Sequence, residues 1–135
     1  MNLYDTVELI KELAKKQPNV NLSYEGDVYD LNSRQDISYA AVVITQTQHR
    51  DDNGMRNFGF SLIYTDRLTD DKSNRLQIQS VAIEALSNIV AGLNEIFDIE
   101  EVVYQPFTEK FDSECAGCYA TLTLRQPIGI CEEEF

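Results

Sequence analysis

The hydrophobic and polar positions along the chain follow a helical period in two long segments. Between Leu3 and Lys16, apolar residues recur at spacings of three and four with charged residues between them, which is typical of an amphipathic helix. The same period predicts a longer helix from Ser73 to about Phe97, with one wide apolar face. That face consists of Leu76, Val81, Ile83, Leu86, Ile89, Val90, Leu93, Ile96 and Phe97.

A period of two predicts the main strands. Asn57–Asp66 alternates cleanly between its two faces, and Ile37–Gln48 is apolar on both faces before it becomes polar. The dipeptide Asn53-Gly54 lies between these strands and readily adopts the left-handed conformations of a tight turn. We therefore predict a long β-hairpin whose polar arms project beyond the core.

Shorter extended segments complete the predicted sheet. Val20–Tyr24 and Val28–Leu31 are short and broken, whereas Glu101–Phe107 and Gly117–Gln126 form a closing pair of strands. This order of elements, without regular β-α alternation, predicts an α+β fold. We expect a mostly antiparallel sheet with a long projecting β-hairpin, packed against an N-terminal helix and a long central helix.

Length and charge narrow the class of protein. The 135 residues predict a single domain over 1–135, with an acidic C-terminal tail over about 128–135. With 23 acidic and 11 basic residues, the formal net charge is −12. So negative a protein repels phosphate groups, which disfavours sequence-independent binding of nucleic acid. An acidic channel lining would, however, suit a channel through which DNA slides without binding. We find no apolar run of about 18 residues and no signal-peptide pattern, so we expect a cytoplasmic protein without a membrane segment.

The cysteines and the single histidine are the candidates for metal binding. Cys115, Cys118, Cys131 and His49 together have the ligand types of a zinc site. Structural zinc sites usually combine two closely spaced pairs of ligands, and this chain has one pair. We therefore expect thiols, with no metal and no cofactor.

No catalytic set emerges from the sequence. His49 lies near Asp51 and Asp52, but no base, nucleophile and orienting residue can be named together. The acidic clusters lack the ligand spacing of an EF-hand loop, and solvated loops explain them. We therefore predict that the protein is not an enzyme.

The projecting hairpin is the candidate functional feature. Polar strands that extend past the core lose conformational entropy when they become ordered, and in a monomer they bury no apolar surface in return. We therefore expect contact with a partner to compensate for this loss. The alternative is a long surface loop, since loops tolerate insertions at little cost. The predicted oligomer interface comprises Arg50, Asp51, Asp52, Asn53, Gly54, Met55 and Arg56.

The order of elements resembles small bacteriophage neck and tail proteins of the tail-terminator and tail-completion type. The resemblance covers nearly the whole chain and rests on the helix from Leu3 to Leu13, the hairpin Tyr39–Tyr64, the helix Leu76–Phe97 and the strand Ala116–Leu122. The run Phe107–Gly117 is also similar to tail-region proteins of phages and prophages of gut Bacteroidetes.

This resemblance implies a structural virion subunit, assembled in the host cytoplasm and located at the head–tail junction or the tail end. It implies a homo-oligomeric ring, with a hexamer as the expected size, in contact with neighbouring phage neck and tail proteins. DNA would pass through the lumen without specific binding. The alternative is an acidic protein-binding module or inhibitor that engages a basic partner.

Overall fold

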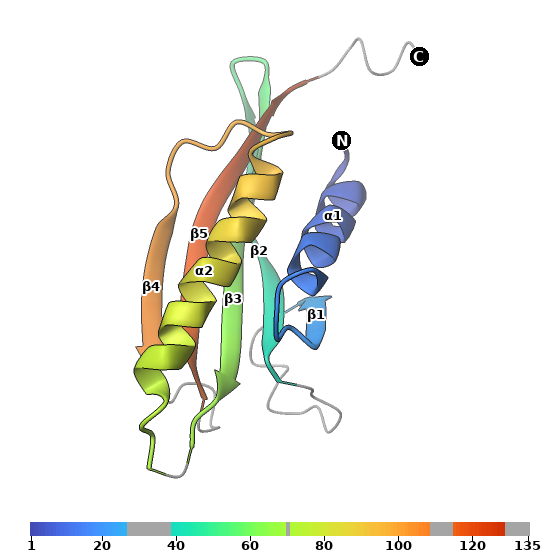
Figure 1. Cartoon of the computed structure of the whole chain (residues 1–135). Coiled ribbons are helices and arrows are strands. Elements are labelled where there is room, and N and C mark those ends of the chain that lie inside the picture. The colour runs from blue at the N-terminus through green and yellow to red at the C-terminus, as the bar shows by residue number, and fades with distance from the viewer. Residues whose placement is uncertain (27–38, 70, 109–114, 129–135) are drawn as a thin grey trace.

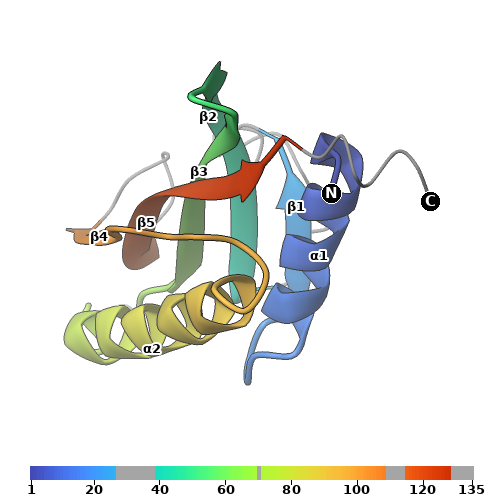
Figure 2. The same cartoon turned by 90° about the horizontal axis from the view of Figure 1, so that it is seen from above.

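Five strands form one sheet, and two helices cover one of its faces in the part of the chain that the structure describes (Figures 1 and 2). The structure is a computed structural model, and it describes residues 1–26, 39–69, 71–108 and 115–128. Its elements are α1 (Leu3–Lys15), β1 (Leu22–Glu25), β2 (Ala41–Asp52), β3 (Met55–Arg67), α2 (Arg75–Leu93), β4 (Val103–Thr108) and β5 (Cys115–Pro127).

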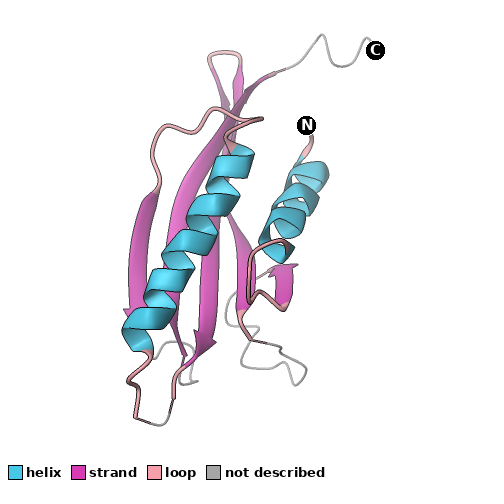
Figure 3. Ribbon diagram, in the orientation of Figure 1, coloured by secondary structure: helices cyan, strands magenta, loops and turns pink. Residues whose placement is uncertain are grey.

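The sheet is mostly antiparallel, which confirms the predicted α+β class. Its strand order is β1-β2-β3-β5-β4, and only the pair β1 and β2 is parallel. The hairpin formed by β2 and β3 is its longest supersecondary unit and extends beyond the ends of both helices (Figure 3). The expected strand over Val28–Leu31 lies outside the described residues.

Helix α1 begins where its sequence supplies a cap. The backbone N–H of Asp5 donates to Asn2 Oδ1 at 2.7 Å, so one of the unpaired N–H groups of the first turn is satisfied. Val7, Ile10 and Ala14 are buried against the sheet and α2, as their spacing predicts.

Helix α2 differs from the prediction in its extent and in its buried face. It ends at Leu93 rather than near Phe97, and Leu76, expected in the apolar face, is 70% exposed. Gln79 is buried instead, because its Nε2 donates to the carbonyl of Phe107 at 3.0 Å and thereby joins α2 to the end of β4.

By length and composition, α2 is apolar enough to cross a membrane, with a mean hydropathy of 1.3. The sequence was expected to contain no such segment. Core helices of globular domains meet the same criteria, and α2 lies along the sheet with seven buried residues. They are Ile78, Gln79, Ala82, Ala85, Leu86, Ile89 and Leu93.

The two faces of the sheet carry different side chains. The helix-covered face holds the main core, in which Phe60, Leu62 and Tyr64 of β3 are at most 1% exposed. The other face has a shorter apolar row in which Val43 and Ile63 are buried side by side. The helix-free face is otherwise polar along the hairpin, so the core ends before the strands do.

Candidate functional site: the hairpin end

The turn of the hairpin has the geometry that its sequence predicts. Asn53 and Gly54 both have positive φ values, 51° and 76°, and Asp52 pairs with Met55 across the turn. Two consecutive left-handed residues define the tight turn that suits the twist of a hairpin.

An ion pair joins the two arms next to the turn. Arg56 Nε and Nη2 donate to the two carboxylate oxygens of Asp51 at 2.8 and 3.0 Å. The hydrogen bond from Arg56 lowers the pKa of Asp51 from its ordinary value, and the same bond raises the pKa of Arg56. Both side chains are exposed, so the pair fixes the register of the arms more than it stabilises the fold.

A β-bulge interrupts β2 between Gln46 and His49, opposite Gly59. A Cβ atom on residue 59 would overlap with Thr47 Oγ1, so glycine leaves the space that the bulge occupies. The backbone N–H of Gly59 donates to His49 Nδ1 at 3.2 Å, in place of a regular ladder bond. This acceptor role places the imidazole proton on Nε2, from which it is donated to Gln46 Oε1 at 2.9 Å.

The hairpin is long, and a third strand supports it up to the turn. Strand β5 accompanies β3 to the pair Met55 and Pro127, and the N–H of Ile128 donates to the carbonyl of Gly54 at 2.9 Å. The N-terminal ammonium of Met1 donates to Gln126 Oε1 at 2.9 Å. These contacts within the chain therefore offset part of the conformational entropy that the hairpin loses on folding.

On the side of β2 that faces away from β3, strand β1 pairs only with Ala41–Ile44. Among the described residues, no strand pairs with this outer edge from Thr45 to Asp52. Unpaired backbone N–H and C=O groups on such an edge are a template for another chain.

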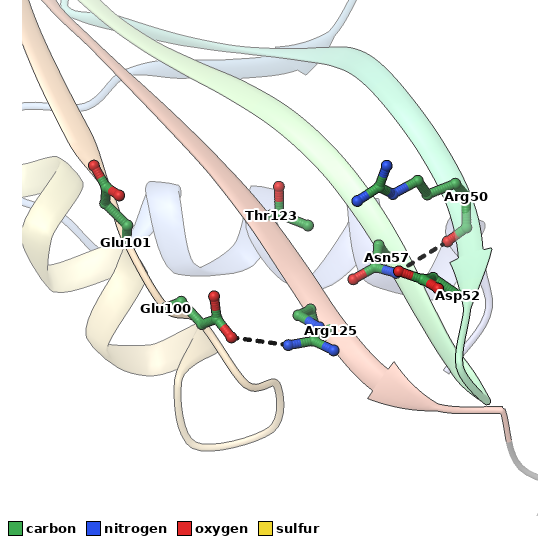
Figure 4. Close-up of a pocket in the computed structure, with 7 residues that line it drawn as sticks. All are labelled: Arg50, Asp52, Asn57, Glu100, Glu101, Thr123 and Arg125. Atoms are coloured by element: carbon green, nitrogen blue, oxygen red, sulfur yellow. Dashed lines mark hydrogen bonds and ion pairs between the residues drawn. The ribbon is translucent and has the colours of Figure 1, made fainter.

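A polar hollow of about 350 Å³ lies on the helix-free face beside the hairpin (Figure 4). Its lining includes Asn57 and Thr123, and its charged groups come from both sides: Arg50 and Asp52 from β2, and Glu100, Glu101 and Arg125 from the other side. Arg125 Nη1 donates to Glu100 Oε1 at 2.9 Å. Within the described residues no group of three potential metal ligands is present.

Exposed apolar side chains gather at the same end of the molecule. The start of α1, the segment after α2 and the end of β5 all lie at the end of the molecule toward which the hairpin points (Figure 1), and Figure 2 shows the hairpin tip set apart from α2. Among the described residues, six large apolar side chains are exposed, and Met1, Tyr4, Ile96 and Ile128 belong to these segments. Tyr4 is 71% exposed, which makes this end a candidate interaction surface.

The candidate zinc ligands are not brought together. Cys115 and Cys118 are buried three positions apart on β5, which places their side chains on opposite faces of the sheet. His49 pairs with Phe58, six residues along β3 from the partner of Cys118, a separation of roughly 20 Å. Cys131 lies outside the described residues. Burial raises the pKa of the Cys118 thiol, which disfavours the thiolate that binds metal.

Comparison with known proteins adds no assignment, because no family model and no curated relative matches the chain. The described site therefore has to be interpreted from its own geometry. Sequence reasoning found the hairpin residues from the Asn-Gly turn, but it missed Tyr4, Glu100 and Arg125. Glu100 and Arg125 lie beside the hairpin because β3 pairs with β5 along its whole length, and the local sequence carries no signal for that pairing.

Proposed function

We propose that this protein is a structural assembly subunit whose hairpin end contacts other subunits. The observation that carries this proposal is the exposure of Met1, Tyr4, Ile96 and Ile128 on segments that all lie at the hairpin end of the molecule. Exposed large apolar side chains normally occur singly, and a group of them marks a contact surface.

The charge distribution supports association with further copies of the same chain. The chain carries a net charge of −12, so two copies repel each other at long range. The hairpin from Ala41 to Arg67 contains three arginines and three aspartates and is therefore neutral. A second acidic copy meets the least repulsion there.

The most specific form of the proposal is a phage structural protein at the head–tail junction or the tail end. A ring of these subunits would place the neutral hairpin ends in subunit contacts and acidic surfaces toward a lumen that DNA passes without sticking. The element order supports this form, and the open edge of β2 offers a backbone contact between neighbours.

Sedimentation velocity over a range of concentrations tests the contact surface. We expect the unmodified protein to associate, and the double variant Tyr4→Ser with Ile96→Ser to associate at least about tenfold more weakly, because an apolar contact is lost. Leu76→Ser is the matched control, since Leu76 is 70% exposed at the opposite end of α2. Equal weakening by the control would reject the hairpin end as the contact surface.

The competing function is an acidic module that binds a basic partner. It is favoured by the connection between α2 and β4, where Glu95, Asp98, Glu100 and Glu101 are all exposed. If the protein stays monomeric at every concentration, does not join head or tail complexes and recovers a basic protein in a pull-down, this second function replaces the first.

A further inference from the structure

A second hollow, of about 220 Å³, lies at the end of the molecule opposite the hairpin turn. It is bounded by the loop after α1, the end of β3 and the first turns of α2. Asn19, Tyr64, Asp66 and Gln77 contribute polar groups, and Ile78 and Val81 contribute an apolar wall. Drug-sized ligands occupy roughly 300–1,000 Å³, so this hollow fits a single side chain or a small molecule.

Tyr64 is the unusual member of this lining. It is only 1% exposed, whereas Asn19 and Gln77 in the same lining are exposed. Buried tyrosine hydroxyls usually have a hydrogen-bond partner, and a ligand group in the hollow is a suitable partner for this one. Burial, together with the negative charge of Asp66, raises the pKa of Tyr64 to about 12, which keeps the hydroxyl protonated.

Among the neighbouring polar groups, Asp66 is the one that can only accept hydrogen bonds when ionised. Asp66 Oδ1 accepts from the N–H of Arg67 at 2.7 Å, which leaves its second carboxylate oxygen for a ligand. Asn74, in contrast, is engaged, because its Oδ1 accepts from the N–H of Thr69 and its Nδ2 donates to the carbonyl of Arg67. The lining therefore offers a carboxylate, a phenol hydroxyl and the side-chain amides of Asn19 and Gln77.

We propose that this hollow binds a primary alkylammonium group, such as a lysine side chain. An ammonium group presents three donors and no acceptor, which matches a carboxylate oxygen with hydroxyl and amide oxygens around it. Its alkyl stem packs on Ile78 and Val81, as lysine stems do on apolar surfaces. The net charge of −12 favours the approach of a cation. This site is independent of the assembly surface and lies at the other end of the fold.

Titration with n-butylammonium, followed by amide chemical shifts, tests the proposal on the whole chain. We expect saturable binding in the millimolar range, with shifts at Asn19, Asp66 and Gln77, and no binding of n-butanol, which has the same stem without the charge. Asp66→Asn should weaken binding by more than roughly tenfold, because the hydrogen bond to a charged carboxylate is lost. Tyr64→Phe should weaken binding by roughly fivefold, because a hydrogen bond to a neutral hydroxyl is lost. Asp71→Asn is the control and should bind normally, because Asp71 bonds locally to Thr69 and Ser73.

A lysine-containing peptide and its acetyl-lysine form distinguish the two sources of the ammonium group. Tighter binding of the lysine peptide than of n-butylammonium identifies a partner's side chain, whereas equal affinities identify a free amine, and both results support the site. Absence of shifts up to roughly 100 mM n-butylammonium overturns the proposal, as does unchanged affinity in Asp66→Asn. Neither result affects the assembly function, which the sedimentation experiment tests separately.

Discussion

One strand, β3, passes through two regions that differ in almost every respect. In the helix-covered half, Phe60, Leu62 and Tyr64 are buried under α1 and α2. Toward the hairpin turn, Asp51 and Arg56 face solvent, and the strand is supported by pairing with β2 and β5 alone. One half of the strand therefore belongs to the core, and the other half lies outside it.

This separation has a consequence for the proposed functions. Substitutions in the helix-covered half should alter folding first, and substitutions at the hairpin end should alter association while the fold persists. The hollow beside Tyr64 lies at the helix-covered half. We expect the effects of substitutions on folding stability to decrease from the helix-covered half to the hairpin end.

The largest effect is expected for Leu62→Ala in the centre of the helix-covered half. Leu62 is fully buried, so the substitution removes apolar contacts and leaves a cavity. We expect the free energy of unfolding to fall by about 3 kcal/mol, measured by urea denaturation. Thr121→Ala, on the exposed side of β5 next to it, is the control and should change little. A loss below about 1 kcal/mol for Leu62→Ala would contradict the assignment of this half as the core.

Alkaline pH should act on the same half through Tyr64. Its pKa is about 12 in the fold, against about 10 in an unfolded chain, so the unfolded state loses its proton first as the pH rises. Stability is therefore fully present below pH 10 and falls as the pH rises toward 12, by at most roughly 2 to 3 kcal/mol.

Comparison of the protein with Tyr64→Phe isolates this contribution. The variant lacks the hydroxyl, so its stability should fall less steeply over the same pH range. Its tyrosine absorbance titration should also lack the component that appears last. If both proteins lose stability in parallel, Tyr64 is not the group responsible.

The sequence predicted those features of both regions that depend on local pattern. The amphipathic period of α1 and the Asn53-Gly54 turn were sufficient for an α+β fold with a long hairpin. The inward position of Gln79 was missed, because it depends on the carbonyl of Phe107, far away in the sequence. The bulge at Gly59 was missed for a similar reason, since a glycine in an alternating strand gives no sign of what lies opposite.

A medium effect is expected at the boundary of the two regions, for Gly59→Ala. The added methyl group overlaps with Thr47 Oγ1 and lies close to the carbonyl of Gln48, so the bulge has to shift. We expect a loss of about 1 to 2 kcal/mol by urea denaturation. Ser61→Ala, the next residue on the same face of β3, is the control. Equal stability of the two variants would show that the bulge is not constrained by the glycine.

The smallest effect on folding is expected for Arg56→Ala beside the turn. The substitution removes the ion pair with Asp51, but both side chains are exposed, and exposed pairs contribute little to stability. We expect the urea midpoint to stay unchanged within error, because β5 still holds β3 through the pair Met55 and Pro127. Association should weaken, since the hairpin end then carries an uncompensated negative charge against an equally acidic second copy. Added salt should restore association, because it screens that repulsion. A variant that loses stability without losing association would reverse the roles assigned to the two regions.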